Sequence, residues 1–550
     1  MKQHHWWENS VAYQIYPRSF QDSNNDGIGD LNGIRQRLPY LKELGVDLVW
    51  ICPVYKSPND DNGYDISDYQ AIQPEYGTME DFDALLREAH EMGLRVIMDL
   101  VINHTSDEHP WFVESRKSKD SPKRDWYIWR DGKDGKEPNN WESIFGGSAW
   151  ELDERTGQYF LHLFSRKMPD LNWQNADAKE ALFKTIRWWV KKGVDGFRVD
   201  AISHIHKPDL TDMPNPEGKP YVPSFDKHMN QPGILDLLRE MKVGGFSEGD
   251  LFTVAEANGV KSSQVQDWTG KDKGVFSALF QFEHISLWNM DPVERFSLNQ
   301  FRKALSRWQD ATREDGNVAL TLENHDLTRC VSHFGNTGEY WKQSAKCLAM
   351  LYFLQKGTPF IYQGQELGMT NADYTRAEQF QDEPSLRGYR ERIAEGMTEE
   401  ESFAIMRDTI RDNCRTPMQW DETTNAGFTT GKPWMDVNRN YVKINAAEQM
   451  QDADSIWHFY QKLIRIRKEE RALNEGVYQL LLPKDEQIYA YTRTLNEKSF
   501  LIICNVSLDE AEVPAELLEG DLVLCNYTDA KAAALRPYEC RLYDRSDKEC

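Results

Sequence analysis

Polar side chains end four of the apolar, β-rich runs in this sequence, and their types are those that do chemistry. The third run ends DLVINHTS (99–106), the fourth GFRVDA (196–201), the fifth VAEANG (254–259) and the seventh LTLENHD (320–326). Any one of these polar residues alone is most simply a salt bridge or a helix cap. Together they predict a catalytic centre made from Asp99, Asn103, His104, Arg198, Asp200, Glu256, His325 and Asp326.

Those runs are part of a regular alternation that predicts the positioning scaffold. Eight short runs lie at 11–16, 48–52, 95–101, 196–201, 251–257, 276–282, 318–323 and 359–363. Between several of them, apolar residues recur at helical spacing, at 31–44, 79–92, 178–192 and 234–243. Strands that alternate with helices indicate a parallel sheet, and eight repeats favour a closed (β/α)8 barrel over an open, doubly wound sheet. Catalytic side chains of such barrels sit at the C-terminal strand ends.

Three regions depart from this alternation and predict further domains. More than seventy residues separate the third strand from the next predicted helix, which is too long for a simple loop and predicts an inserted domain. A second insertion, 370–416, is charged and polar and precedes a last helical stretch at 453–467. From Gly476 the pattern alternates with period two, as in an antiparallel β domain. We predict barrel segments 1–104 and 175–475, an inserted domain 105–174 and a C-terminal β domain 476–550.

The composition restricts the partners. A formal net charge of -24 over 550 residues repels nucleic acids and acidic membrane surfaces. No apolar stretch reaches the length of a membrane span, and the start MKQHHWWENS lacks a signal segment. The eight cysteines are scattered without C-x-x-C pairs, which argues against a zinc site and a disulfide framework. We expect a cytoplasmic monomer that uses a small neutral substrate and no organic cofactor.

The four polar strand ends resemble the conserved regions of glycoside hydrolase family 13, the α-amylase family. The segments AYQIYPRSFQDSNNDGIGDLNGI, DNGYDISDY, RDWYIWRD, MPDLNW, FIYQGQELGMTN and RTPMQWD are similar to its bacterial oligo-1,6-glucosidase and α-glucosidase branch. The resemblance covers essentially the whole chain. It implies a retaining double displacement in which Asp200 is the nucleophile, Glu256 the general acid and base, and Asp326 the carboxylate that holds the 2- and 3-hydroxyls of the sugar.

The resemblance also implies the environment of these carboxylates. Arg198, two residues before the nucleophile, would keep Asp200 ionised and oriented. Apolar surroundings or the neighbouring carboxylates would raise the pKa of Glu256, so that it can donate a proton near neutral pH. The remaining residues of the substrate pocket would be two histidines, an Asp-Arg pair that closes the non-reducing end, and two aromatic walls: His104, His325, Asp61, Arg415, Tyr64 and Phe164.

The segment DSNNDGIGD (22–30) places oxygen-bearing side chains at alternate positions around a glycine turn. An EF-hand is excluded because the twelfth position is Gly33 rather than a glutamate. The family has a metal-binding loop here, so a structural Ca2+ is favoured over a metal-free turn. Its ligands would be Asp22, Asn24, Asp26, Asp30 and the carbonyl of Ile28.

Two positions depart from the relatives and bear on the substrate. Asn258 stands where this branch has a proline, and Ala201 follows the nucleophile where enzymes that prefer α-1,6 links carry valine. We therefore expect an exo-acting α-glucosidase that removes α-1,4-linked glucose from short malto-oligosaccharides, with some transglucosylation. The alternatives are an oligo-1,6-glucosidase, a trehalose-6-phosphate hydrolase or a sucrose isomerase. A non-catalytic transporter subunit is disfavoured, since such subunits lack the carboxylates.

Overall fold

The chain forms a closed barrel of eight parallel strands in the order β1-β15-β14-β13-β12-β10-β5-β2. The computed structural model describes residues 5–284, 297–530 and 533–546. The barrel strands are β1 (Ala12–Ile15), β2 (Leu48–Ile51), β5 (Arg95–Val101), β10 (Gly196–Asp200), β12 (Phe252–Glu256), β13 (Ala278–Phe280), β14 (Val318–Leu320) and β15 (Thr358–Tyr362). Seven of these strands lie within the predicted runs, and β15 begins one residue before its run, at Thr358, so the predicted fold class is confirmed.

The described residues fall into two compact units, one drawn from Trp50–His90 and Arg95–Phe280, the other from the rest of the chain. The first of these holds the segment inserted after β5. Its helices are α2 (Met79–Glu91, which ends just beyond this unit), α3 (Pro110–Ser115), α4 (Ala176–Lys192), α5 (Phe225–His228), α6 (Ile234–Gly244) and α7 (Val265–Thr269). Its small sheets are made from β3 (Tyr55–Lys56), β4 (Asp68–Ile72), β6 (Trp129–Asp131), β7 (Trp141–Glu142), β8 (Trp150–Asp153), β9 (Gln158–Leu161) and β11 (Val222–Pro223).

The other unit contains the helices that follow the later barrel strands and the C-terminal sheet. Its helices are α1 (Leu31–Leu44), α8 (Leu298–Ala311), α9 (Cys330–Phe334), α10 (Trp341–Phe353), α11 (Glu383–Ala394), α12 (Glu399–Thr409), α13 (Ala446–Gln451), α14 (Ile456–Glu469) and α15 (Arg471–Glu475). The apolar residues 348–354 that could suggest a membrane segment belong largely to the buried helix α10. Among the described residues, helices are too short or too polar to traverse a bilayer.

Cap residues explain why the predicted helix bounds agree with the structure. The Asp30 side chain accepts from Gly33 N at the start of α1, and Gly45 ends it with a left-handed φ of 100°. Asn175 and Gly193 do the same for α4, where φ of Gly193 is 108°. The observed α1 coincides with the predicted 31–44, and α4 begins two residues before the predicted 178.

The polar insertion 370–416 forms a helical hairpin with its own core. Helices α11 and α12 pack against each other, and a Thr398–Glu401 capping box starts α12. A small apolar cluster underlies the hairpin and includes Tyr374, Phe380 and Met406. Asp382 caps the start of α11 through a bond from Ser385 N. The hairpin is therefore an ordered platform, although its composition alone indicates only a long insertion.

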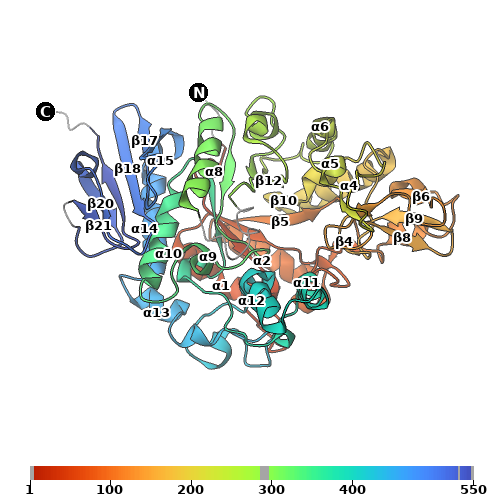
Figure 1. The fold of residues 1–550 in the computed structure, drawn as a ribbon, viewed down its shortest axis with the longest axis horizontal. Coiled ribbons are helices and arrows are strands. Elements are labelled where there is room, and N and C mark those ends of the chain that lie inside the picture. The colour runs from red at the N-terminus through yellow and green to blue at the C-terminus, as the bar shows by residue number, and fades with distance from the viewer. Residues whose placement is uncertain (1–4, 285–296, 531–532, 547–550) are drawn as a thin grey trace. The chain divides into compact units, whose positions relative to one another are not determined.

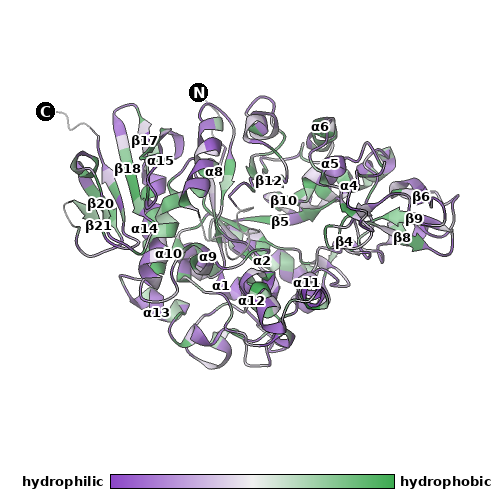
Figure 2. Ribbon diagram, viewed as in Figure 1, coloured by the Kyte–Doolittle hydropathy of each residue, from purple (hydrophilic) through white to green (hydrophobic). Residues whose placement is uncertain are grey.

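The C-terminal strands form the predicted antiparallel sheet, in the order β16-β17-β18-β22-β20 (Figure 1). They are β16 (Val477–Leu481), β17 (Ile488–Leu495), β18 (Lys498–Asn505), β20 (Asp521–Cys525) and β22 (Cys540–Asp544), beside the pair β19 (Ala511–Glu512) and β21 (Ala534–Leu535). Hydrophobic residues run along β18 (Figure 2), in agreement with its burial. The sheet is joined to α8 by Arg302, which donates to the carbonyls of Pro483, Asp485 and Ile488. The exact bounds of the three domains stay a prediction.

The seven described cysteines are free thiols, and six of them are buried. Cys550 lies outside the described residues. For the described cysteines, the expectation of buried thiols without a disulfide framework agrees with the structure. Buried free cysteines pack in the interior as small apolar side chains, and no further role is needed to explain their positions.

The packing of β10 against β12 generates the first prediction. A Cβ at Gly196 would lie 1.8 Å from the carbonyl oxygen of Phe252, so the strand that carries Asp200 has no room for a side chain there. Gly196→Ala should therefore lower the free energy of unfolding by about 3 kcal/mol. Gly218→Ala is the control: nothing lies near its Cβ, and its left-handed backbone (φ 66°) should cost only about 1 kcal/mol. Equal losses for both variants in denaturant titrations would contradict this account.

Candidate active site

The guanidinium of Arg198 binds three carboxylates at the ends of neighbouring strands. Nη1 donates to Asp99 Oδ1 at 2.8 Å and to Asp200 Oδ1 at 2.6 Å, while Nη2 lies 3.0 Å from Glu256 Oε2. Strands β5, β10 and β12 are adjacent, and Arg198 and Asp200 lie on the same face because they are two residues apart. The cation and Asp99 are almost fully buried, while Asp200 and Glu256 keep 11% and 16% of their side chains exposed. Within this cluster, the predicted catalytic carboxylates Asp200 and Glu256 are thus the ones that solvent can reach.

Three aromatic side chains donate hydrogen bonds to Asp99. Trp50 Nε1 and Tyr64 OH both donate to Asp99 Oδ2 at 3.1 Å, and Tyr55 OH donates to the Asp99 carbonyl at 2.6 Å. Both oxygens of the buried carboxylate therefore have donors. Asp99 serves to anchor Arg198, which in turn orients the two more accessible carboxylates.

Burial dominates the electrostatics of this cluster. It raises the pKa of Asp99 to about 6, against the opposing effect of the Arg198 guanidinium. Burial also raises the pKa of Asp200 well above its usual value, and Arg198 again opposes this while Glu256 and Asp99 add to it. The cation is thus needed to limit the mutual repulsion of three closely spaced carboxylates.

The backbone after β10 positions Glu256. Ala201 has a left-handed backbone, with φ of 43° and ψ of 30°, and its N–H donates to Glu256 Oε2 at 2.7 Å. The side chain at position 201 is thus subject to a backbone constraint as well as to any demand of the substrate. A small residue fits the left-handed conformation more easily than a β-branched one.

His104 and Phe164 lie together at the end of β5. Their ring centroids are 5.1 Å apart, and His104 Nε2 is 3.3 Å from the Tyr64 carbonyl oxygen. Burial lowers the pKa of His104 to about 4, so the ring is neutral at pH 7. Behind it, the buried Lys207 bonds Asp170 Oδ2 at 2.7 Å and Asn103 Oδ1 at 2.9 Å. This ion pair fixes the MPDLNW segment beside the histidine.

The turn DNGYD is shaped by Asp65. Its carboxylate accepts from the backbone N–H groups of Asp60 at 2.9 Å and Asp61 at 3.2 Å and from Ser57 Oγ at 2.8 Å. The Asp61 carbonyl in turn accepts from Tyr64 N at 3.0 Å. These bonds place the Tyr64 hydroxyl on Asp99 and leave the Asp61 side chain partly exposed.

The loop after Glu256, which contains the partly exposed Asn258, is held by Asn230. The Asn230 N–H donates to the Ser203 carbonyl at 2.8 Å, and its side-chain amide donates to the Gly259 carbonyl at 3.0 Å. Ser203 belongs to the short helix η4 (Ile202–His204) that follows the predicted nucleophile. Asn230 therefore links the two loops that follow Asp200 and Glu256.

A second cluster surrounds Asp326 in the other compact unit. Asp326 Oδ1 accepts from Arg415 Nη2 at 2.8 Å and from Arg411 Nη1 at 3.1 Å, and its Oδ2 lies 3.1 Å from His325 Nε2. Gln14 Nε2 lies 2.8 Å from the opposite ring nitrogen of His325. Arg415 Nε donates to the His325 carbonyl at 2.9 Å. The structure thus brings three predicted site residues together: Asp326, His325 and Arg415.

The loop predicted to bind calcium is rich in internal hydrogen bonds. Asp22 Oδ1 accepts from Asn24 N and Asn25 N, and its Oδ2 accepts from Gly27 N and Thr429 Oγ1. Asp30 caps α1. Asn24 Oδ1 accepts from Asp26 N, and Asp26 Oδ1 accepts from Ile28 N. Within the described residues, no three His, Cys, Asp or Glu side chains are gathered closely enough to hold a metal ion. The hard oxygen donors suit Ca2+. Asp22 already accepts two hydrogen bonds on each oxygen, so an ion there would replace some of these bonds.

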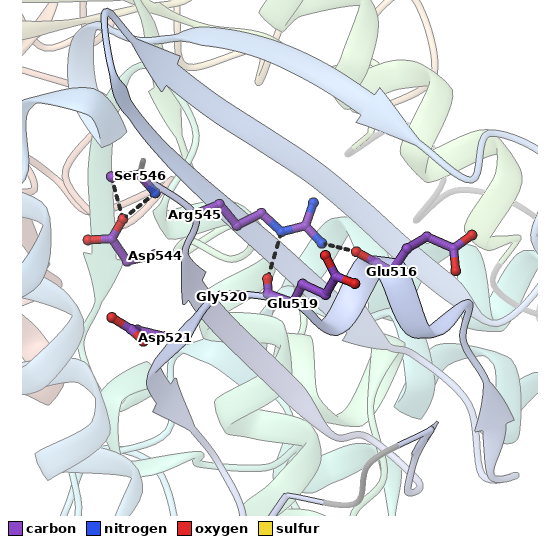
Figure 3. Close-up of a pocket in the computed structure, with 7 residues that line it drawn as sticks. All are labelled: Glu516, Glu519, Gly520, Asp521, Asp544, Arg545 and Ser546. Carbon is purple, nitrogen blue, oxygen red and sulfur yellow. Dashed lines mark hydrogen bonds between the residues drawn. The ribbon is translucent and has the colours of Figure 1, made fainter. Parts of the chain in front are cut away.

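An acidic groove on the C-terminal sheet contains no predicted site residue (Figure 3). Its lining consists of Glu516, Glu519, Gly520, Asp521, Asp544, Arg545 and Ser546. The Arg545 guanidinium donates to the backbone carbonyls of Glu519 and Glu516, both at 3.0 Å. The groove is a surface feature of the sheet and adds nothing to the carboxylate clusters.

Sequence reasoning missed several residues that complete these clusters. Trp50, Tyr55 and Asp382 gave no signal, since a buried aromatic or a helix cap looks the same whether or not it supports a site. Arg411 could have been noticed, because it lies four residues before Arg415 in RDNCR. The Asp61–Arg415 pairing and the remaining role assignments stay predictions.

Comparisons with known proteins agree with this architecture. Residues 14–476 match the family described as alpha amylase, catalytic domain. The chain is 52% identical to a probable oligo-1,6-glucosidase of Bacillus subtilis over 98% of its length and 99% of that protein. It is 50% identical to an oligo-1,6-glucosidase of Halalkalibacterium halodurans, over 98% of each chain. The crystal structure of a Bacillus licheniformis trehalose-6-phosphate hydrolase superposes with a TM-score of 0.93 at 41% identity, over 99% and 100% of the two chains.

These relatives correct the expected substrate. The expectation of an α-1,4-specific enzyme for malto-oligosaccharides is wrong, because full-length relatives at about half identity are named oligo-1,6-glucosidases. That expectation depended on Ala201, which stands where valine was associated with α-1,6 links. Valine has two more carbon atoms than alanine, and a difference of that size beside a sugar changes specificity by only about 1 to 3 kcal/mol. The left-handed backbone of Ala201 further weakens any inference from its side chain to linkage.

The barrel, the carboxylate clusters and the full-length similarity lead to the same assignment. The matched residues span most of the chain, and the relatives that share it are glycoside hydrolases of the α-glucosidase type. The chain belongs to the α-amylase family, glycoside hydrolase family 13.

Proposed function

We propose that this protein is a retaining, exo-acting oligo-1,6-glucosidase, which releases terminal α-1,6-linked glucose from short isomalto-oligosaccharides. The observation that carries the proposal is the 52% and 50% identity, over nearly the whole chain, to proteins with that name. A crystal structure of an isomaltulose synthase from Protaminobacter rubrum also superposes, with a TM-score of 0.93 at 40% identity over 98% and 99% of the two chains. The fold is therefore shared by several reactions, and the sequence relatives favour hydrolysis of 1,6 links.

The proposed reaction proceeds in two displacements. In the first, an oxygen of Asp200 bonds to the anomeric carbon while the Glu256 carboxyl gives its proton to the departing glycosidic oxygen. In the second, the Glu256 carboxylate takes a proton from water, the water oxygen bonds to the same carbon, and Asp200 is released. Arg198 supports both steps, because it bonds Asp200 and Glu256 through different nitrogens. Two inversions leave the α configuration unchanged.

The other pocket residues have roles taken from the family resemblance. Asp326 would hold the 2- and 3-hydroxyls of the distorted sugar, with His104 and His325 as further hydrogen-bond partners. Tyr64 and Phe164 would provide apolar walls, and Asp61 with Arg415 would close the non-reducing end. Ala201 and Asn258 would face the departing sugar. The buried, neutral His104 and the Asp99-anchored Tyr64 support this arrangement, since both rings are fixed before substrate arrives.

We further propose a structural Ca2+ at the loop 22–30, held by oxygens of Asp22, Asn24, Asp26, Ile28 and Asp30. The support is the chemistry of the donors, which are hard oxygens at alternate positions. The amide hydrogen bonds already give the loop its shape, so the ion would add stability to a folded loop. It takes no part in the displacement steps.

The roles of the carboxylates can be tested by two isosteric variants. Asp200→Asn and Glu256→Gln should each lower kcat on an α-glucoside by about 1000-fold or more, because each removes one half of the double displacement. Circular dichroism and melting should show that both variants fold. The wild-type protein should release α-glucose first, as followed by NMR. Initial release of β-glucose would exclude the retaining mechanism and the role given to Asp200.

The linkage preference can be tested with a panel of disaccharides. We expect kcat/KM on isomaltose to exceed that on maltose, sucrose and trehalose 6-phosphate by about tenfold or more, a ratio within the reach of pocket contacts. Released glucose and the sugar products should both be measured. Trehalose 6-phosphate as the best substrate would place the enzyme with its structural neighbour instead. Conversion of sucrose to an isomer without net hydrolysis would indicate a sucrose isomerase.

The metal proposal can be tested by chelation. At a hundredfold excess over its Kd, an ion that binds only the folded state stabilises the protein by about 2.7 kcal/mol. EDTA should therefore lower the melting temperature of the wild type, whereas Asp26→Ala should melt lower and be insensitive to EDTA. Elemental analysis should find one calcium in the purified wild type and none in the variant. Unchanged melting in EDTA together with an absence of metal would refute the site.

A further inference from the structure

Asp382 lies behind the Asp326 cluster and contacts both of its arginines. Its Oδ1 accepts from Nε of Arg411 at 2.9 Å and from Nη2 of the same guanidinium, and lies 3.6 Å from Nη1 of Arg415. The same two guanidiniums reach Asp326 through their other nitrogens. Asp382 and Asp326 therefore sandwich a pair of arginines.

Burial distinguishes the two carboxylates. The side chain of Asp382 is 1% exposed and that of Arg415 is 2% exposed, whereas Asp326 keeps 36% of its side chain accessible. A buried guanidinium without an anionic partner is strongly unfavourable. Asp382 supplies a second, buried anion beside Asp326, while Asp326 keeps part of its side chain accessible to a ligand.

Further hydrogen bonds fix Asp382 in this position. Its Oδ2 accepts from Ser385 N and Oγ, so the carboxylate also caps helix α11. The buried Asp412, which lies between Arg411 and Arg415 in the chain, accepts from the backbone N–H of Asp382 at 2.9 Å and of Gln381 at 2.6 Å. The start of the hairpin is thereby tied to the segment that carries the arginines.

We infer that Asp382 is a positioning residue for catalysis, which orients Arg411 and Arg415 so that they hold Asp326 in its working geometry. The insertion 370–416 is then the support of the site, and α11 begins at the point where that support is needed. The inference rests on the proposed α-glucosidase function. It adds to that function a buried residue that does not touch the reacting atoms.

The variant Asp382→Asn separates the two duties of the side chain. Asparagine caps helices as well as aspartate does, so its amide oxygen can keep the bonds from Ser385. Its NH2 group would then face the guanidiniums, and the charge is lost. We expect kcat on 4-nitrophenyl α-glucoside to fall about 100-fold, the effect of a small misplacement in an active site, with KM changed less than about threefold. Inhibition by 1-deoxynojirimycin, a cationic glucose analogue, should weaken in parallel.

Two control variants separate positioning from general damage. Ser385→Ala removes the Oγ bond to Oδ2 but keeps the bond from the backbone N–H and leaves Oδ1 and its charge in place, so kcat should fall far less than in Asp382→Asn. Asp373→Asn removes a carboxylate from the same insertion, at an exposed ion pair 3.8 Å from Arg439, and should also leave kcat unchanged. A fall in kcat that follows melting temperature across all three variants would overturn the positioning role.

A double mutant tests the route through Arg411. Arg411→Gln should lower kcat by a similar factor, and the double variant Asp382→Asn/Arg411→Gln should be about as slow as the slower single one, because both changes break one chain of contacts. The inference would be overturned if the two single-variant losses in kcat multiplied in the double variant. It would also be overturned if a folded Asp382→Asn had the wild-type kcat. If Asp382→Asn does not fold, wild-type kcat in Arg411→Gln overturns it. Absence of wild-type activity on any α-glucoside would instead refute the proposed function.

Discussion

The buried guanidinium of Arg198 is the interaction on which the candidate site depends. Three carboxylates lie within hydrogen-bond distance of one cation, and burial raises the pKa of two of them, Asp99 and Asp200. The cation offsets this and fixes the direction of each carboxylate at once. Removal of Arg198 would therefore disturb both the charge and the geometry of Asp200 and Glu256.

The barrel is what allows one arginine to reach three acids. Asp99, Asp200 and Glu256 come from three adjacent parallel strands, whose registers place Arg198 opposite Asp99 on one side and Val254 on the other. The close approach of β10 to β12 at Gly196 sets this spacing. Rigid strands thus carry the reacting groups, while the loops that follow them carry the residues proposed to recognise the sugar.

The Asp326 cluster follows the same principle, with two arginines in place of one. There, two guanidiniums stand between an accessible carboxylate and a buried one. In each cluster a buried arginine, Arg198 or Arg415, holds the accessible acids, which fixes their direction before a substrate binds. Such preorganisation avoids the cost of ordering these groups during the reaction. The hairpin of the charged insertion carries Asp382, and its own apolar core keeps that carboxylate in a fixed place.

The sequence by itself determined the eight strands, the C-terminal sheet and the residues that end the strands. These depend on local hydrophobic periodicity and on cap residues such as Asp30 and Gly45, which act within a few positions of the chain. Only the tertiary structure decided which side chains support them, because Trp50, Tyr55 and Asp382 act on groups distant in sequence. Linkage preference was misread from Ala201, since one small side chain carries too little energy to set it and its backbone conformation is invisible in the sequence.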